Sequence, residues 1–147
     1  MKILAIASEG GHWVQLLRLT PAFKNQELSF MSTNPDIGPT LNNYTYYRVP
    51  DANQGTKLDL IRCFFHVAWV VFKQRPKAII TTGAAPGLMG IIAGRLIGAK
   101  TIWIDSIANA EQLSLSGKIA GYFADRVYTQ WANLETNKIF FKGNVLS

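Results

Sequence analysis

Near the N-terminus, a histidine follows two glycines in the stretch Ser8-Glu9-Gly10-Gly11-His12, directly after a short apolar run. Adjacent glycines let a ligand approach the backbone, and the N–H groups that open a following helix attract anions. Histidine ordinarily titrates near neutrality, so His12 is a candidate general base for a hydroxyl group. These residues fit a second interpretation as well, in which His12 only caps or packs against the start of the helix.

This glycine loop is not a known nucleotide-binding motif. The dinucleotide fingerprint needs a third spaced glycine, and a P-loop ends in Gly-Lys-Ser/Thr, which residues 8–12 do not. His66 has no second histidine, cysteine or carboxylate at metal-ligand spacing, so we expect neither a metal site nor a cofactor. The single cysteine, Cys63, lies in an apolar segment and is expected to be a buried free thiol in a reducing compartment.

Two further loops carry small or polar residues. Thr81-Thr82-Gly83-Ala84-Ala85-Pro86-Gly87 follows an apolar run, and its proline is well placed to begin a helix whose N-terminus faces a ligand. Trp103-Ile104-Asp105 leads into Ser106-Ile107-Ala108-Asn109. Asp105 would end a strand, where a carboxylate can orient a substrate. The alternative is that Asp105 forms an Asx turn or caps a helix.

Apolar runs of strand length alternate with helix-length stretches, which is typical of βαβ units with a parallel sheet. We therefore expect one α/β domain over residues 1–147, with a Rossmann-like parallel sheet and helices on both faces. The predicted strands are Lys2–Ala7, Leu28–Thr33, Tyr44–Val49, Ala78–Thr82, Thr101–Asp105 and Arg126–Gln130. Ligands bind at the carboxyl ends of such strands, so the three loops should lie at one edge of the sheet.

The sequence also predicts features of individual helices and of the C-terminal segment. A first helix over 12–23 would place Val14, Leu16, Leu17 and Phe23 on its apolar side. Glycines at 90, 94 and 98 lie four apart, which favours close packing of a helix on the sheet. Ser114 or Ser116 could cap a later helix around 119–123, and residues 139–143 are expected to form a short tail.

The segment 58–72 is apolar nearly all round, which indicates either deep burial or contact with an apolar partner outside the protein. The formal net charge of +6 arises within residues 57–100, where Asp59 is the only acid. No nucleic-acid-binding motif accompanies this basic stretch, so anionic lipid or a phosphorylated substrate is the better expectation. An interfacial helix would use Lys57, Arg62, Phe65, Trp69, Lys73 and Arg75. A buried helix of the outer layer is the alternative.

Taken together and in this order, the loops resemble the acceptor-binding half of a split glycosyltransferase of the GT-B type. The chain is similar to the eukaryotic asparagine-linked glycosylation subunit that recruits a catalytic partner to the membrane, and to bacterial capsule and exopolysaccharide relatives. It also resembles the N-terminal domain of the peptidoglycan N-acetylglucosaminyltransferase MurG. The matching stretches are Gly10-Gly11-His12, Gly83-Ala84-Ala85-Pro86-Gly87, Trp103-Ile104-Asp105-Ser106, Ala124-Asp125-Arg126-Val127 and Thr129-Gln130-Trp131.

This resemblance implies that the chain is the N-terminal half of a GT-B enzyme and is peripheral at the cytoplasmic face of the inner membrane. It would hold a lipid-pyrophosphate-linked sugar, while a catalytic subunit binds most of the UDP-sugar donor at a shared cleft. His12 would be the base, and the glycine loops would line the pyrophosphate. The acceptor-binding residues expected are Gly10, Gly11, Gly83, Ala84, Ala85, Pro86, Gly87, Asp105, Ser106 and Asn109.

Two other functions stay open at this stage. The chain could be a non-catalytic scaffold that recruits and activates its partner, or a free-standing nucleotide-binding protein of flavodoxin-like build. Eukaryotic members of the resembling family have an N-terminal hydrophobic segment, whereas this sequence begins with its first predicted strand. Membrane attachment is therefore expected through the 57–77 stretch.

Overall fold

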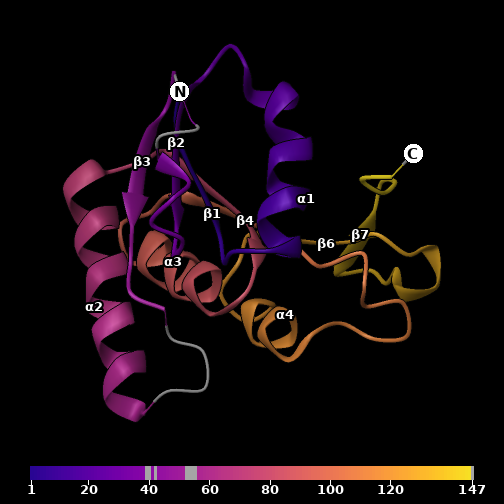
Figure 1. The fold of residues 1–147 in the computed structure, drawn as a ribbon. Helices are drawn as coiled ribbons and strands as arrows, with labels where there is room; N and C mark the ends of the chain where they lie inside the picture. Colours follow the sequence, from indigo (N-terminus) through magenta and orange to yellow (C-terminus); the bar gives the residue numbers. More distant parts are fainter. Residues whose placement is uncertain (39–40, 42, 52–55, 147) are drawn as a thin grey trace.

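The computed structural model describes residues 1–38, 41, 43–51 and 56–146, and it contains one sheet of parallel strands. Seven strands pair in the order β3-β2-β1-β4-β5-β6-β7 (Figure 1). Their bounds are β1 Lys2–Ala7, β2 Glu27–Ser32, β3 Thr45–Arg48, β4 Ala78–Gly83, β5 Lys100–Ile104, β6 Arg126–Thr129 and β7 Ile139–Phe141. The predicted α/β class with a parallel sheet is confirmed.

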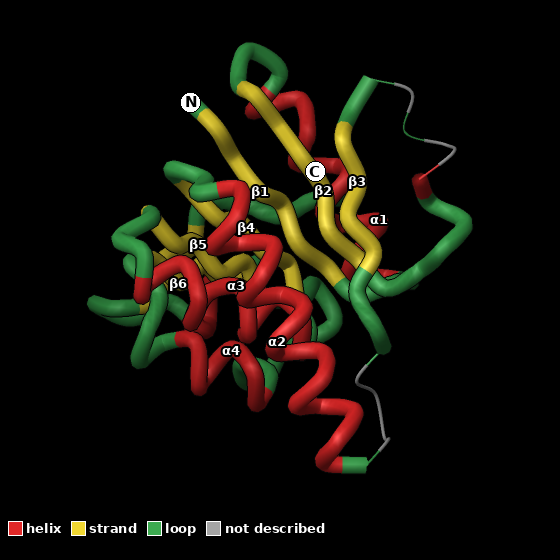
Figure 2. The backbone as a smooth tube through the Cα atoms, turned by 90° about the vertical axis from the view of Figure 1, so that its left-hand side faces the viewer, coloured by secondary structure: helices red, strands yellow, loops and turns green. Residues whose placement is uncertain are grey.

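Helices cover both faces of the sheet. α1 (Gly11–Leu19) lies on one face, and α2 (Lys57–Gln74), α3 (Ala85–Leu96) and α4 (Leu115–Ala120) lie on the other, as Figure 2 shows. This follows from right-handed crossovers, because the chain steps from β1 to β2 in one direction and from β3 through β4 and β5 to β6 in the opposite direction. α3 packs between α2 and α4.

The core is double because alternate side chains of each strand point to opposite faces. Leu4, Ile6 and Ile79 belong to the cluster beneath α2 and α3, together with buried residues of α2. Ile3 and Ile80, from the same strands, belong to the cluster beneath α1. Strands buried on both faces explain why the sequence shows continuous apolar runs and no alternation with polar residues.

The first helix differs from its prediction. α1 ends at Leu19 and a 3₁₀ turn follows over Thr20–Phe23, with Pro21 near its start. The predicted apolar face is correct for Leu16, which is buried, and for Phe23, which packs against the same cluster. It is wrong for Val14 and Leu17, which are 50% and 39% exposed, and it missed Trp13, which is buried. A buried glutamine, Gln15, lies between Trp13 and Leu16. Because Gln15 is polar but faces the core, the sequence pattern did not reveal the true apolar face of the helix.

The C-terminal segment and the glycine series bring two further corrections. Residues 139–141, expected to be part of a tail, form β7 and pair with β6 from Val127↔Ile139 onward. A strand of three residues has no periodicity to detect.

Glycine is needed for packing at Gly94, where a Cβ would lie 2.5 Å from Ile79 Cδ1, whereas Gly98 has a φ of +77° and open space around it. Gly98 therefore ends the helix and does not pack on the sheet.

Helix α2 begins with a capping box, in which the side chains of Thr56 and Asp59 each accept a hydrogen bond from the other residue's backbone N–H. Cys63 on its inner face is fully buried, and this burial raises the pKa of the thiol to about 11. The prediction of a buried free thiol is confirmed.

In the part of the chain that the structure describes, no helix has the length and apolar character needed to cross a bilayer.

Candidate functional site

Two cavities lie at the carboxyl edge of the sheet, where the three loops meet. The first has a volume of about 240 Å³ and the second about 300 Å³. The first is lined by His12, Thr82, Gly83, Ala84, Trp103, Asp105, Ser106, Ala108, Asn109, Ser114 and Ser116. The second is lined by Ser8, Glu9, Thr33, Asp51, Ala84, Ala85, Pro86 and Ser116. Because Ala84 and Ser116 line both, the cavities adjoin.

His12 is held against the end of β4 by two hydrogen bonds. Its Nδ1 lies 2.9 Å from the carbonyl oxygen of Thr82, and the Thr82 hydroxyl donates to the carbonyl oxygen of His12 over 2.6 Å. A carbonyl oxygen only accepts, so Nδ1 must bear the hydrogen. In the neutral ring this leaves the lone pair on Nε2, which is the arrangement a general base requires.

Two glycines of the second loop make this geometry possible. A Cβ on Gly83 would lie 2.8 Å from His12 Nδ1, and its φ of +116° is a conformation that other residues rarely adopt. A Cβ on Gly87 would overlap the side chain of Thr81. Gly83 therefore allows the imidazole to approach, and Gly87 allows α3 to begin directly against β4.

Asp105 is 2% exposed and accepts hydrogen bonds from protein donors on both carboxylate oxygens. Trp103 Nε1 and Ser114 Oγ donate to Oδ1 over 3.0 and 2.7 Å. Asn109 Nδ2 and the Ser114 backbone N–H donate to Oδ2 over 3.2 and 3.0 Å. This carboxylate thus fixes the loop that follows β5 and places Asn109 at the cavity. Contact of Asp105 with an acceptor stays a prediction.

Ser114 is the residue that caps α4, since its hydroxyl accepts from the Gly117 backbone N–H over 2.9 Å. Of the two candidate caps, Ser114 is therefore the correct one. Gly117 packs so tightly here that a Cβ would lie 2.5 Å from Asp105 Oδ1. Hydrogen bonds and close packing thus connect the start of α4 to Asp105 at the first cavity.

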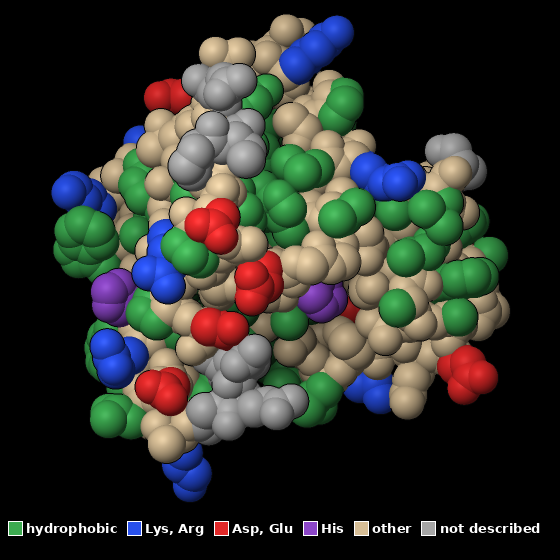
Figure 3. Space-filling model, in the orientation of Figure 1, with side chains coloured by type: hydrophobic (Ala, Val, Ile, Leu, Met, Phe, Trp, Pro, Cys, Tyr) green, Lys and Arg blue, Asp and Glu red, His purple; other side chains and the backbone are tan. Residues whose placement is uncertain are grey.

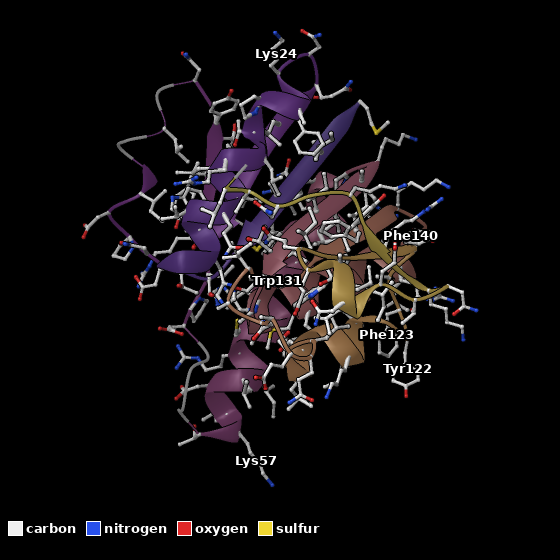
Figure 4. The ribbon with its side chains drawn as sticks, turned by 90° about the vertical axis from the view of Figure 1, so that its right-hand side faces the viewer. Lys24, Lys57, Tyr122, Phe123, Trp131 and Phe140 are labelled. Carbon is white, nitrogen blue, oxygen red and sulfur yellow. The ribbon has the colours of Figure 1, made fainter. Side chains whose placement is uncertain are left out.

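Several residues that support the site were not predicted from the sequence. Gln15 on α1 and Gln130 after β6 are buried and bond to each other behind the first cavity. Trp131 Nε1 donates to the carbonyl oxygen of Ile107 over 2.7 Å, and Figure 4 shows Trp131 beside the C-terminal segment. Gln15 could have been noticed as a polar residue within an apolar helical stretch. The others have no local signal, because their partners are distant in sequence.

The two cavities differ in the acidic residues that line them. Neither cavity is lined by a lysine or arginine among the described residues. The second carries the carboxylates of Glu9 and Asp51, and the buried hydroxyl of Thr33 has no hydrogen-bond partner. Gly10 and Gly11, predicted to bind the acceptor, line neither cavity, although a Cβ on either would meet open space. The backbone there is accessible to a ligand.

α2 has two apolar faces, which explains its all-round apolar sequence. One face packs in the core through Cys63, Val67 and Val71, while Phe65 and Trp69 are 66% and 60% exposed. The four basic residues predicted to contact a membrane, Lys57, Arg62, Lys73 and Arg75, are exposed on the same helix or at its end. Lys73 Nζ lies 4.6 Å from the centre of the Trp69 ring. Figure 3 shows basic and hydrophobic side chains interspersed along the side of the molecule where α2 lies.

No cluster of three or more His, Cys, Asp or Glu side chains suited to a metal ion occurs within the described residues. His66 is exposed on α2.

Residues 47–144, more than half of the chain, match the family described as "Oligosaccharide biosynthesis protein Alg14 like". The chain belongs to the Alg14-like family. It is 26% identical over 168 residues to the UDP-N-acetylglucosamine transferase subunit ALG14 of Homo sapiens, covering 92% of this chain and 77% of the human protein. The Yarrowia lipolytica protein of the same name is 26% identical over 161 residues, covering 90% of this chain and 74% of its own length.

Solved structures share the fold of this Alg14-like chain. MurG of Acinetobacter baumannii superposes with a TM-score of 0.79 at 13% identity, covering 98% of this chain and 45% of MurG. UDP-N-acetylglucosamine 2-epimerase of Rickettsia bellii gives a TM-score of 0.75 at 15% identity, covering 99% of this chain and 45% of the epimerase. The chain thus spans about half the length of these proteins. At such identities the likeness establishes the fold alone.

Proposed function

We propose that this chain is the acceptor-binding subunit of a two-chain glycosyltransferase. The enzyme transfers a sugar from a UDP-sugar to a lipid-pyrophosphate-linked sugar in the biosynthesis of a bacterial polysaccharide, such as a capsule or exopolysaccharide. The observation that carries the proposal is the placement of His12, which lines a cavity at the carboxyl edge of the sheet and whose hydrogen bond from Nδ1 to Thr82 leaves Nε2 as the basic nitrogen. Membership of the Alg14-like family and relatives named as transferase subunits support it.

In this proposal, the acceptor hydroxyl lies in the first cavity and gives its proton to His12 Nε2. The hydroxyl oxygen forms a bond to C1 of the donor sugar, and the bond between C1 and the UDP oxygen breaks, so that UDP leaves with the electron pair. The acceptor pyrophosphate lies along the backbone of the glycine loops, near the N-termini of α1 and α3. Ser106 and Asn109 contact the acceptor from the loop after β5.

A second chain is proposed to bind most of the UDP-sugar. The proposal is supported by the fold, which corresponds to about half of a MurG chain. The partner would close over the carboxyl edge of the sheet and complete the active site at the shared cleft.

The experiment that tests this function is transfer of labelled sugar from UDP-sugars, beginning with UDP-N-acetylglucosamine, to lipid-linked acceptor in membranes. This chain, its partner and the two co-expressed chains are compared. We expect product only with both chains. Full-rate transfer by this chain alone, or by the partner alone without any gain from this chain, would contradict the proposal.

The exposed face of α2 is proposed to attach the protein to the cytoplasmic face of the inner membrane. Replacing both Phe65 and Trp69 with glutamate should lower binding to vesicles containing phosphatidylglycerol at least tenfold, because each large apolar side chain contributes about 2 kcal/mol on burial. Co-sedimentation with the vesicles measures this. Leu96→Glu is the control, since Leu96 is 71% exposed but belongs to α3. Equal losses in both variants would count against an α2 membrane face.

A further inference from the structure

Two buried glutamine side chains lie behind the first cavity and are bonded to each other. Gln15 on α1 is 7% exposed, and Gln130 after β6 is 4% exposed. Gln130 Nε2 donates to Gln15 Oε1 over 2.7 Å, although the residues lie 115 positions apart in the chain. Buried amides are costly unless each of their polar atoms finds a partner, so this pair calls for a reason.

Backbone groups fix the orientation of both amides. The Ile107 backbone N–H donates to Gln15 Oε1 over 3.1 Å, and since an N–H group cannot accept, the atom facing it must be the oxygen. Gln130 Nε2 donates to the carbonyl oxygen of Asp105 over 2.9 Å, and its Oε1 accepts from the Val145 N–H over 2.9 Å. Exchanging the oxygen and nitrogen of either amide would place two donors or two acceptors opposite each other.

The fixed orientation of Gln15 determines how the Ser106 hydroxyl is used. Gln15 Nε2 donates to Ser106 Oγ over 3.1 Å, and the Ala108 backbone N–H also donates to Ser106 Oγ over 3.1 Å. A hydroxyl has two acceptor lone pairs and one hydrogen, so both lone pairs are occupied. Among the described residues, the Ser106 hydrogen has no acceptor, while Ser106 lines the first cavity.

We propose that Gln15 is a positioning residue that sets the Ser106 hydroxyl as a hydrogen-bond donor to an oxygen atom of the lipid-linked acceptor. The inference rests on the proposed function and adds that the cavity wall presents a hydrogen-bond donor at Ser106. A serine is otherwise able to donate or accept, and the amide removes that choice before the acceptor binds. Gln130 holds Gln15 in place and connects it to the C-terminal segment at Val145.

The variant Gln15→Glu tests this polarity with little change of shape. The carboxylate keeps an oxygen for the Ile107 N–H and for Gln130 Nε2, but it places a second oxygen opposite Ser106. The Ser106 hydrogen then turns toward Glu at position 15 and away from the cavity. In the two-chain enzyme, we expect the KM for the lipid-linked acceptor to rise about tenfold, with kcat and the KM for the UDP-sugar changed less than about twofold.

Gln112→Glu is the matched control, because Gln112 is exposed and its Oε1 accepts a hydrogen bond from Lys118 Nζ. Ser106→Ala removes the donor itself and should raise the acceptor KM to a similar extent. If Gln15 acts through Ser106, the double variant Gln15→Glu/Ser106→Ala should have the acceptor KM of Ser106→Ala alone. Thermal unfolding of each variant verifies that the fold is retained.

Three results would overturn the inference. An unchanged acceptor KM in Gln15→Glu, or in Ser106→Ala, removes the role of the donor. Additive effects in the double variant show that Gln15 acts by another route. Each of these three results leaves the proposed function standing, whereas absence of transfer by the wild-type two-chain enzyme overturns the proposed function together with this inference.

Discussion

His12→Ala is expected to slow sugar transfer by the two-chain enzyme about 10²-fold or more, while binding of the partner chain stays unchanged. General bases contribute about 10²- to 10⁴-fold to a rate, and the substitution removes the Nε2 lone pair that the Thr82 carbonyl leaves available. The measurement is kcat with saturating UDP-sugar and a lipid-linked acceptor in detergent, accompanied by co-purification of the two chains.

The chain offers its own control for this substitution, since its only other histidine is His66. His66 is exposed on α2, on the opposite side of the core from α1, so His66→Ala should keep full activity in detergent. Retention of activity by His12→Ala, with the partner still bound, would favour the non-catalytic scaffold over the catalytic subunit.

Asp105→Ala is expected to have the largest effect on stability, lowering the free energy of unfolding by about 3 kcal/mol. The substitution leaves buried donors of Trp103 and Ser114 without an acceptor, and it releases Asn109 and the cap of α4. Urea denaturation followed by tryptophan fluorescence measures the change.

Asp125→Ala provides the comparison for Asp105. Asp125 is exposed at the opposite edge of the sheet, and its Oδ2 accepts from the backbone N–H and the hydroxyl of Thr101. Asp125 accepts two hydrogen bonds where Asp105 accepts four, and Asp125 itself is exposed, so a smaller loss of about 1 kcal/mol is expected. Equal losses in the two variants would show that the four hydrogen bonds of Asp105 contribute no more to stability than the two of Asp125.

The sequence was sufficient to predict the parallel sheet because its strands are apolar on both faces and alternate with helix-length stretches. Six strands were placed within about one residue, and the loops at their carboxyl ends carry His12, Ser106 and Asn109, which the structure brings to one cavity. Local composition determines these features. Strand β7 could not be predicted, and the choice between an exposed and a buried 57–72 helix could not be made, since each depends on which neighbours the folded chain supplies.

The support of the site was also beyond sequence reasoning. The hydrogen bond between Gln15 and Gln130 joins residues 115 positions apart, and the choice between two roles for Asp105 depends on which donors reach it. Such contacts leave no periodicity or motif in the chain. Gly83 shows the same difficulty, since its sequence context predicts a turn while its packing against the His12 ring is visible only in three dimensions.

The neighbouring positions of β1 and β4 have a consequence for how the protein folds. These strands pair at the centre of the sheet, yet the His12 and Thr82 that they bring together are 70 positions apart. Contacts of such separation form slowly, because a long loop must close before they add stability. During synthesis, His12 leaves the ribosome well before its partner strand exists. We expect the N-terminal β1-α1-β2 unit to stay incompletely packed until β4 has been synthesised. Pairing of β4 with β1 then completes both the core and the cavity.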